Sequence, residues 1–215
     1  MQLYTYFRSS AAYRVRIALH LKGLAWSAVP VHLLRGGGEQ HSADYRVLNP
    51  SALVPTLVED GWALGQSVAI MEYLEETHPA PALLPSGARE RAQVRALVQT
   101  IACDIHPLNN LRVLQYLEHE IHMGEAQRAY WYRHWVGLGL ASLETLLQAH
   151  GKHASLFCLG DTPTLADCCL IPQMANARRF HTPLEAFPTL VRIDAHCRAL
   201  PAFAAAAPEN QADFS

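Results

Sequence analysis

Strand-like sequence is confined to the part of this chain that precedes a proline-rich segment at residues 79–87. Before that segment, short apolar runs alternate with amphipathic helical runs. After residue 88 the strand-like runs disappear and long helical patterns take their place. The sequence therefore predicts two domains, an α/β domain at residues 1–80 and an all-helical domain at residues 88–215.

The order of elements in the first domain favours a small mixed sheet covered by helices. The pattern of strands and helices is βαβαββα, with strands expected at residues 2–6, 26–31, 56–59 and 62–64 and helices at 11–22, 42–48 and 67–77. This order predicts parallel pairing in the first half and an antiparallel hairpin around Asp60-Gly61. We expect Arg14, Arg16 and Lys22 at the polar edges of the first helix.

The second domain is expected to contain long helices with identifiable interruptions. They are predicted at residues 89–120, 125–150, 165–180, 189–199 and 201–206. Pro107 should disturb the first of them, and Gly137 and Gly139 suggest close packing of the second. Thr164 to Asp167 resembles a capping box at the start of a buried helix. The polar tail beyond Pro208 should be loose.

Composition and charge limit the partners of the chain. Half of the residues are apolar and the net charge is −2, which is typical of a globular protein without general affinity for nucleic acid. The first 38 residues contain no Asp or Glu but five Arg and Lys, so this region suits an anionic ligand. No signal peptide or membrane span is visible, no metal site is expected, and the five cysteines indicate buried, reduced thiols in a cytoplasmic protein.

Two serines stand where the first strand ends and the first helix begins. Ser9 or Ser10 is a plausible N-cap of that helix. Hydroxyls and free N–H groups at the positive end of a helix can hold an anion, including a thiolate. The simpler alternative is that the serines only cap the helix.

Three further stretches of the first domain suit the same site. Gln40 follows a glycine-rich loop, and Gln66-Ser67 stands at another helix N-terminus that suits a carboxylate or is simply capped. Val54-Pro55 opens a strand, and the proline removes a donor from the sheet. A cis peptide there would expose the Val54 backbone to an extended peptide, and an ordinary trans turn is the alternative.

These stretches together resemble the zeta class of cytosolic glutathione transferases, which includes the maleylacetoacetate and maleylpyruvate isomerases. The signature S-S-x-x-[WY]-R-V-R-I-A-L of that class stands at residues 9–19, and Leu48-Asn49-Pro50 and Pro172-Gln173 also match. The resemblance covers nearly the whole chain and implies a thioredoxin-like N-terminal domain, an all-α C-terminal domain and a homodimer. One departure is Ala11, where many relatives have Cys, so the reactive thiol must come from bound glutathione.

The resemblance implies a glutathione-dependent cis–trans isomerase that converts a maleyl keto acid to its fumaryl isomer. The substrate would be maleylacetoacetate, from aromatic amino acid breakdown, or maleylpyruvate, from gentisate breakdown, and the residues do not separate the two. One alternative is a glutathione transferase acting on small α-halo acids. Another is a non-catalytic glutathione-binding protein.

The resemblance also implies roles for individual residues. Ser9 or Ser10 would face the thiolate, with Arg8 beside them as a further catalytic residue. The residues expected to bind glutathione are Ser9, Ser10, Gln40, Val54, Pro55, Gln66, Ser67, His106 and Asn110. Arginines pair with carboxylates in bidentate fashion, and those expected to hold the dicarboxylate substrate are Arg8, Arg112, Arg178 and Arg179. For each arginine the alternative is a solvated side chain or a structural ion pair.

Overall fold

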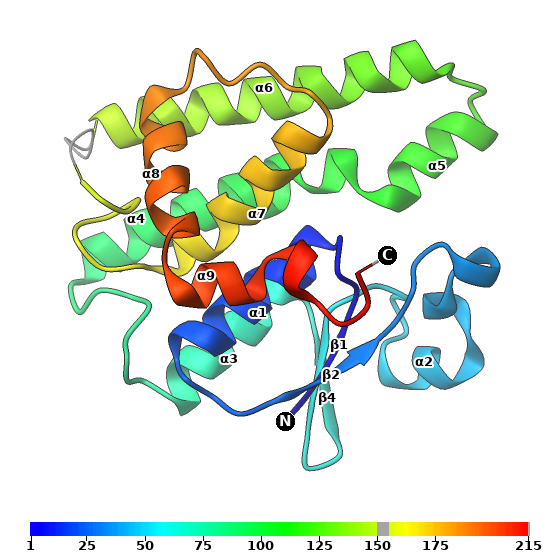
Figure 1. Ribbon diagram of the computed structural model, residues 1–215, viewed down its shortest axis with the longest axis horizontal. Coiled ribbons are helices and arrows are strands. Elements are labelled where there is room, and N and C mark those ends of the chain that lie inside the picture. Colours follow the sequence, from blue (N-terminus) through cyan, green and yellow to red (C-terminus); the bar gives the residue numbers. More distant parts are fainter. Residues whose placement is uncertain (150–154, 215) are drawn as a thin grey trace. The chain divides into compact units, whose positions relative to one another are not determined.

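The computed structural model describes residues 1–149 and 155–214, and the chain divides into two compact units (Figure 1). The first unit comprises Met1–Leu83 and the last segment of the chain, from Arg198 onward. The second unit comprises Leu84–Cys197. The chain therefore returns to its first unit at its end, and the expected domain division at residues 1–80 and 88–215 stays a prediction.

A four-stranded mixed sheet forms the centre of the first unit. Its strands are β1 (Gln2–Thr5), β2 (Ser27–Pro30), β3 (Thr56–Glu59) and β4 (Trp62–Gly65), in the order β2-β1-β3-β4. β1 and β2 are parallel, and β3 and β4 form an antiparallel hairpin, so both predicted pairings are confirmed. The antiparallel pairing of β1 with β3, which joins the two halves of the sheet, was not predicted. Asp60 and Gly61 both have positive φ, as the two central residues of a type I′ hairpin turn require.

Helices in the first unit pack around the sheet and end close to their predicted limits. They are α1 (Ser10–Leu21), α2 (Ala43–Leu48), α3 (Ser67–Thr77) and α9 (Pro201–Ala206), with 3₁₀ turns at Arg35–Gly37, Glu39–His41 and Pro208–Asn210. α1 packs against both α3 and α9 (Figure 1). The last helix, which follows all of the second unit in sequence, thus contributes to the core around α1.

The expectation that three basic side chains lie on polar edges of the first helix was wrong. Arg14, Arg16 and Lys22 are all buried. The Arg16 guanidinium donates to Thr5 Oγ1 and to the carbonyls of Tyr6, Phe7 and Ala206. Burial lowers the pKa of Arg16 to about 10, although the charges of Tyr13 and Asp213 oppose that shift. A buried cation is tolerated because acceptors surround it.

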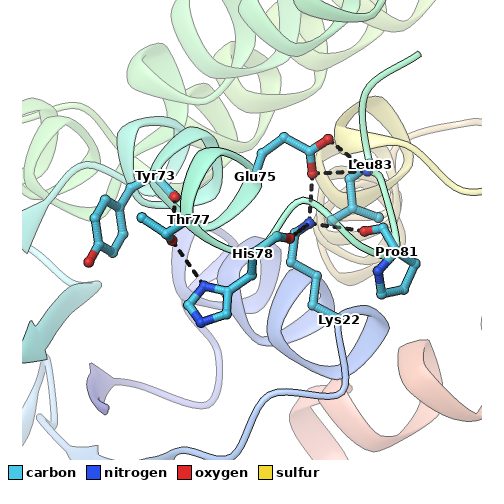
Figure 2. A network of polar contacts seen from close by, with 7 residues as sticks. All are labelled: Lys22, Tyr73, Glu75, Thr77, His78, Pro81 and Leu83. Atoms are coloured by element: carbon cyan, nitrogen blue, oxygen red, sulfur yellow. Dashed lines mark hydrogen bonds and ion pairs between the residues drawn. The ribbon is translucent and has the colours of Figure 1, made fainter. Parts of the chain in front are cut away.

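Lys22 is the centre of a second buried network, drawn in Figure 2. Its Nζ lies 2.7 Å from Glu75 Oε2, 2.7 Å from the His78 carbonyl and 3.0 Å from the Pro81 carbonyl. Both oxygens of Glu75 also accept the Leu83 N–H, at 3.0 and 3.1 Å. The network joins the ends of α1 and α3 to the proline-rich segment, whose Ala80-Pro81 peptide is cis.

The expectation that the tail beyond Pro208 is loose was also wrong. The Asp213 carboxylate accepts a hydrogen bond from the Phe7 N–H at 2.9 Å. The ring of Phe214 packs edge-on against the ring of Phe7, with centroids 5.4 Å apart. The tail is therefore held against the turn that leads from β1 into α1.

The described part of the second unit contains helices and no strand. They are α4 (Ala88–Gln99), a π-helix (Thr100–Ile105), a 3₁₀ turn (Pro107–Asn109), α5 (Leu111–His119), α6 (Glu125–Ala149), α7 (Leu165–Arg179) and α8 (Pro188–Arg198). The single helix expected at 89–120 is thus broken around Pro107, which has no N–H to donate. A side chain at Gly139 would collide with Ile105, whereas Gly137 faces open space. Residue 150, the expected end of α6, lies outside the described residues.

The predicted capping box begins α7. The Thr164 side chain accepts from the helix backbone, and Asp167 Oδ2 accepts from the Thr164 N–H at 2.8 Å. Asp167 Oδ1 also accepts from the Cys158 N–H, and burial raises the pKa of the Asp167 carboxyl. Across residues 1–149 and 155–214, no helix is long and apolar enough to cross a membrane.

Four of the five cysteines are buried, which confirms the expectation for those four, and Cys103 is exposed. Burial raises the pKa of the thiols of Cys158, Cys168 and Cys197. Since the thiolate is the reactive form, we expect a disulfide reagent at neutral pH to label one thiol per native chain and all five after unfolding. Absorbance of the released thiol counts them, and Cys103→Ser should abolish the native signal.

Candidate active site

Four stretches that carry predicted site residues converge at one end of the sheet. Thr5 at the end of β1 pairs with Pro30 at the end of β2, and Tyr4 pairs with Thr56 at the start of β3. Thr56 in turn pairs with Gly65, the last residue of β4. The segments that continue from these strand ends therefore begin side by side, and they contain Arg8-Ser9-Ser10, Gln40, Val54-Pro55 and Gln66-Ser67.

Ser9 and Ser10 differ in their surroundings. Ser9 is the N-cap of α1, with extended backbone angles, and its Oγ accepts the Ala12 N–H at 3.2 Å. Its side chain is partly exposed, and its hydroxyl proton has no acceptor among the described residues. Ser10 is the first helical residue and is buried. Ser9 thus caps the helix and can still donate a hydrogen bond to an anion at the positive helix end.

The exposed Arg8 lies in the turn directly before the N-cap. Its guanidinium donates to the Tyr6 hydroxyl at 3.0 and 3.3 Å and lies 5.2 Å from the centre of the Phe7 ring. These contacts leave further guanidinium N–H groups at the surface, because arginine has five donors. Arg8 can therefore offer positive charge close to Ser9.

The Val54-Pro55 peptide is cis, so the trans alternative does not hold. The side chain of Val54 packs in one buried cluster with Tyr6 and Phe7, beside the turn that leads to Ser9. The neighbouring Leu53 carbonyl accepts from Tyr45 Oη at 2.6 Å and from Asn49 Nδ2 at 2.8 Å. The backbone of Val54 itself has no hydrogen bond in residues 1–149 and 155–214, so it is available to an extended ligand.

The start of α3 has the features of an anion site. Gln66 precedes the helix with φ of 68°, a left-handed conformation that a non-glycine residue rarely adopts. No side chain in the described chain caps this helix, so its first N–H groups are open. The buried Ser67 hydroxyl accepts from Arg14 Nη1 at 3.2 Å, which places a cation behind the helix end.

Gln40 is buried at the end of the loop after β2. Its Nε2 lies 3.4 Å from the Leu33 carbonyl and 3.1 Å from His41 Nε2. Its Oε1 is buried and has no hydrogen-bond partner among the described residues. A buried acceptor without a partner is unusual and suits an N–H donor of a ligand.

Three predicted residues of the second unit lie around the break before α5. Asn110 is the N-cap of α5, and its Oδ1 accepts the Arg112 N–H at 3.2 Å. His106 Nε2 lies 3.3 Å from Asn110 Nδ2. Arg112 is exposed on the first turn of α5. The break in the helix thus brings these three residues together within their unit.

The two arginines at the end of α7 differ. Arg178 forms an ion pair with the buried Asp194 of α8, which favours the structural alternative for this residue. Arg179 is exposed, and its guanidinium lies 4.6 Å from the centre of the Phe180 ring. Arg179 therefore lies at the surface of the unit, and Arg178 is paired with a buried carboxylate.

Sequence reasoning missed the residues that hold this site in place. Asn49 was matched to the family motif but given no role, yet its side chain fixes Leu53 and Thr56. Asp213 lies 206 residues after the Phe7 amide that it binds, and no local pattern indicates such a contact. The only sequence signal for the burial of Arg16 was its position within an apolar helical run.

Comparisons with known proteins show the family and the fold of this chain. The family model described as "Glutathione S-transferase, N-terminal domain" matches residues 8–77. A probable maleylacetoacetate isomerase of Vibrio cholerae serotype O1 is 52% identical over 98% of this chain and 97% of its own length. The holo structure of a maleylpyruvate isomerase, described as a bacterial zeta-class glutathione S-transferase, has a TM-score of 0.96 at 44% identity over 100% of both chains. The maleylacetoacetate isomerase of Methylobacterium extorquens AM1, solved with malonate and glutathione, has a TM-score of 0.94 at 39% identity, also over 100% of both chains.

The thioredoxin-like sheet and the helical second unit are those of a cytosolic glutathione transferase, which confirms the predicted fold class. Within that class, the chain belongs to the zeta-class family of maleylacetoacetate and maleylpyruvate isomerases. The family expected from the residues 9–19 signature is therefore confirmed.

Proposed function

We propose that this protein is a glutathione-dependent isomerase that converts a maleyl keto acid to its fumaryl isomer. One observation carries the proposal: the partly exposed Ser9 hydroxyl caps α1 at the same end of the sheet as the uncapped N-terminus of α3. One helix end suits a thiolate, and the other suits a carboxylate of the same peptide. The relatives named as isomerases of this kind support the proposal.

Different residues of the first unit are proposed to bind different parts of glutathione. Bound glutathione supplies a thiolate that adds to the cis double bond, permits rotation about the resulting single bond and then leaves. Ser9 donates a hydrogen bond to the sulfur, and the end of α1 adds positive potential, so both lower the pKa of the thiol. Ser67 and the N–H groups of α3 hold the γ-glutamyl carboxylate, while Val54 pairs with the cysteinyl backbone. Gln40 accepts an N–H through its buried Oε1.

Arginines hold the carboxylates of the substrate and stabilise the enolate that forms on addition. Arg8, beside Ser9, is the first candidate because its guanidinium is exposed. Arg112 and Arg179 remain candidates on the second unit, where His106 and Asn110 are proposed to contact glutathione. Arg178 is the weakest candidate because Asp194 already neutralises its charge.

The protein is proposed to act in the cytoplasm as a homodimer. The five free cysteines fit a reducing compartment. The outer face of α6 carries Leu138, which is 59% exposed, beside small uncharged residues such as Gly137, Ala141 and Ser142. Light scattering measures the oligomeric state, and a mass of one chain would contradict the homodimer.

The function is tested by following the absorbance of maleylacetoacetate and of maleylpyruvate, each with and without glutathione. We expect turnover only when glutathione is present, because the chain has Ala11 and no cysteine beside the serines. The keto acid with the larger kcat/KM identifies the substrate. If neither compound is turned over with glutathione, the proposal is refuted. Release of a glutathione conjugate from an α-halo acid would favour the transferase alternative.

A further inference from the structure

The turn before Ser9 is held by charged groups that come from elsewhere in the chain. Tyr6 to Ser9 forms a turn closed by a hydrogen bond of 2.9 Å from the Ser9 N–H to the Tyr6 carbonyl. Arg16 Nη2 donates to the Phe7 carbonyl at 3.0 Å, and the Asp213 carboxylate accepts the Phe7 N–H at 2.9 Å. Phe7 and Arg16 are buried, whereas Asp213 is partly exposed and reaches the Phe7 N–H from the surface.

The segment that carries Asp213 is itself firmly anchored. Gln211 Nε2 donates to the carbonyls of Ala205 and Ala207, both at 2.9 Å, and Asn210 Nδ2 donates to the Ala204 carbonyl at 2.7 Å. These carbonyls lie at the C-terminal end of α9 or directly after it, where the α-helical hydrogen bonds stop. Those of Ala204 and Ala207 each accept a backbone N–H as well, at 3.1 Å. Two amide side chains thus fix the course of the chain just before Asp213.

We propose that Asp213 is a positioning residue of the glutathione site: through the Phe7 amide it fixes the turn that aims the Ser9 hydroxyl at the sulfur. The inference rests on the role proposed above for Ser9. Asp213 and Arg16 both bind the backbone of Phe7: Asp213 accepts its N–H, and Arg16 donates to its carbonyl. Phe214 adds an apolar contact, since its ring packs edge-on against Phe7. A hydroxyl that drifts by one ångström loses much of its hydrogen bond to a thiolate.

Three variants separate this role from simple anchoring. Asp213→Ala removes the acceptor, Asp213→Asn keeps a carbonyl acceptor without the charge, and Glu209→Gln removes a charge from an exposed position of the same segment. Hydrogen exchange of the peptide around Phe7 is measured without glutathione. The titration of the bound thiol is then followed by thiolate absorbance in the complex, and kcat/KM is measured last.

For Asp213→Ala we expect faster exchange of the Phe7 amide, a raised pKa of the bound thiol and a fall in kcat/KM of about tenfold, the size expected for loss of one hydrogen bond to a charged group. The direction of the thiol shift is diagnostic, because removal of a negative charge by itself favours the thiolate and lowers its pKa. Asp213→Asn should keep most of the activity, and Glu209→Gln should match the wild type.

A thiol pKa and kcat/KM that stay at wild-type values in Asp213→Ala would overturn the proposal, even if the protein unfolds at lower temperature. That outcome would reduce Asp213 to an anchor of the tail. Exchange and thiol titration use no keto acid. A wild type that binds glutathione but does not isomerise the maleyl compounds therefore counts against the proposed function and leaves the effect of Asp213 measurable.

Discussion

Replacing Ser9 by alanine is expected to lower kcat/KM by about 10- to 100-fold and to raise the pKa of the bound glutathione thiol, since a hydrogen bond to a charged group contributes about 1.5–3 kcal/mol. The Ser9 hydroxyl is the only group of the two serines that is partly exposed, and it already points its lone pair at the Ala12 N–H. Its proton is thereby directed away from the helix. Stopped-flow turnover and thiolate absorbance measure the two effects.

Two controls separate catalysis from folding in this experiment. Loss of an N-cap costs about 1 kcal/mol of stability, so the unfolding of Ser9→Ala must be measured beside its activity. Ser9→Thr retains both hydroxyl and cap and should keep much of the activity. Ser10→Ala should leave the thiol pKa near the wild-type value, because Ser10 is buried in the first turn of α1. If Ser10→Ala raises the pKa of the bound thiol and Ser9→Ala does not, Ser10 rather than Ser9 contacts the thiolate.

Replacing Lys22 by methionine is expected to lower the free energy of unfolding by about 3–5 kcal/mol, the usual cost of leaving one partner of a buried ion pair uncompensated. The Lys22 ammonium is fully buried and satisfies Glu75 and two carbonyls of the proline-rich segment (Figure 2). Without it, the buried Glu75 carboxylate loses the cation that lies 2.7 Å from its Oε2. Urea denaturation followed by circular dichroism measures the loss.

An exposed ion pair of the same unit provides the matched control. Arg35 Nη1 lies 3.7 Å from Glu39 Oε1, and the arginine side chain is 71% exposed. Arg35→Met should change stability by less than about 1 kcal/mol, since exposed pairs contribute little. The double variant Lys22→Met/Glu75→Leu should be more stable than Lys22→Met alone, because it removes the stranded charge. A loss for Lys22→Met no larger than that for Arg35→Met contradicts the interpretation of this network.

Local signals in the sequence were sufficient for the sheet and for the ends of most helices. The Asp60-Gly61 turn, the Ser9 cap and the Thr164 capping box act within a few residues, so each is visible in a short stretch. The convergence of the predicted stretches at one end of the sheet follows from the strand order β2-β1-β3-β4. The pattern βαβαββα predicted the parallel first pair and the hairpin of that sheet, but not the order of its strands. The stretches chosen from the sequence as candidate site residues of the first unit therefore meet at one end of the sheet, and their roles stay a prediction.

Contacts between distant segments were not visible in this way. Arg16 and Lys22 were placed at polar edges because charge usually indicates exposure, yet carbonyls from residues 206, 78 and 81 make their burial favourable. The π-helix at Thr100–Ile105 was missed because a proline marks a disturbance without specifying its form. The tail was expected to be loose from its polarity, but Asp213 and Phe214 find partners at Phe7.

The last segment of the chain belongs to the first unit, and this affects the order in which the two units can fold during synthesis. Domains generally fold N-terminal first as they emerge from the ribosome. Here the carbonyl of Ala206, which binds Arg16, and the carboxylate of Asp213 are synthesised after the whole of the second unit. Until they are made, the Arg16 guanidinium lacks one of its acceptors and the Phe7 N–H lacks its partner. The second unit can therefore fold before the first unit has all of its contacts. The glutathione-binding half of this enzyme, although made first, is finished last.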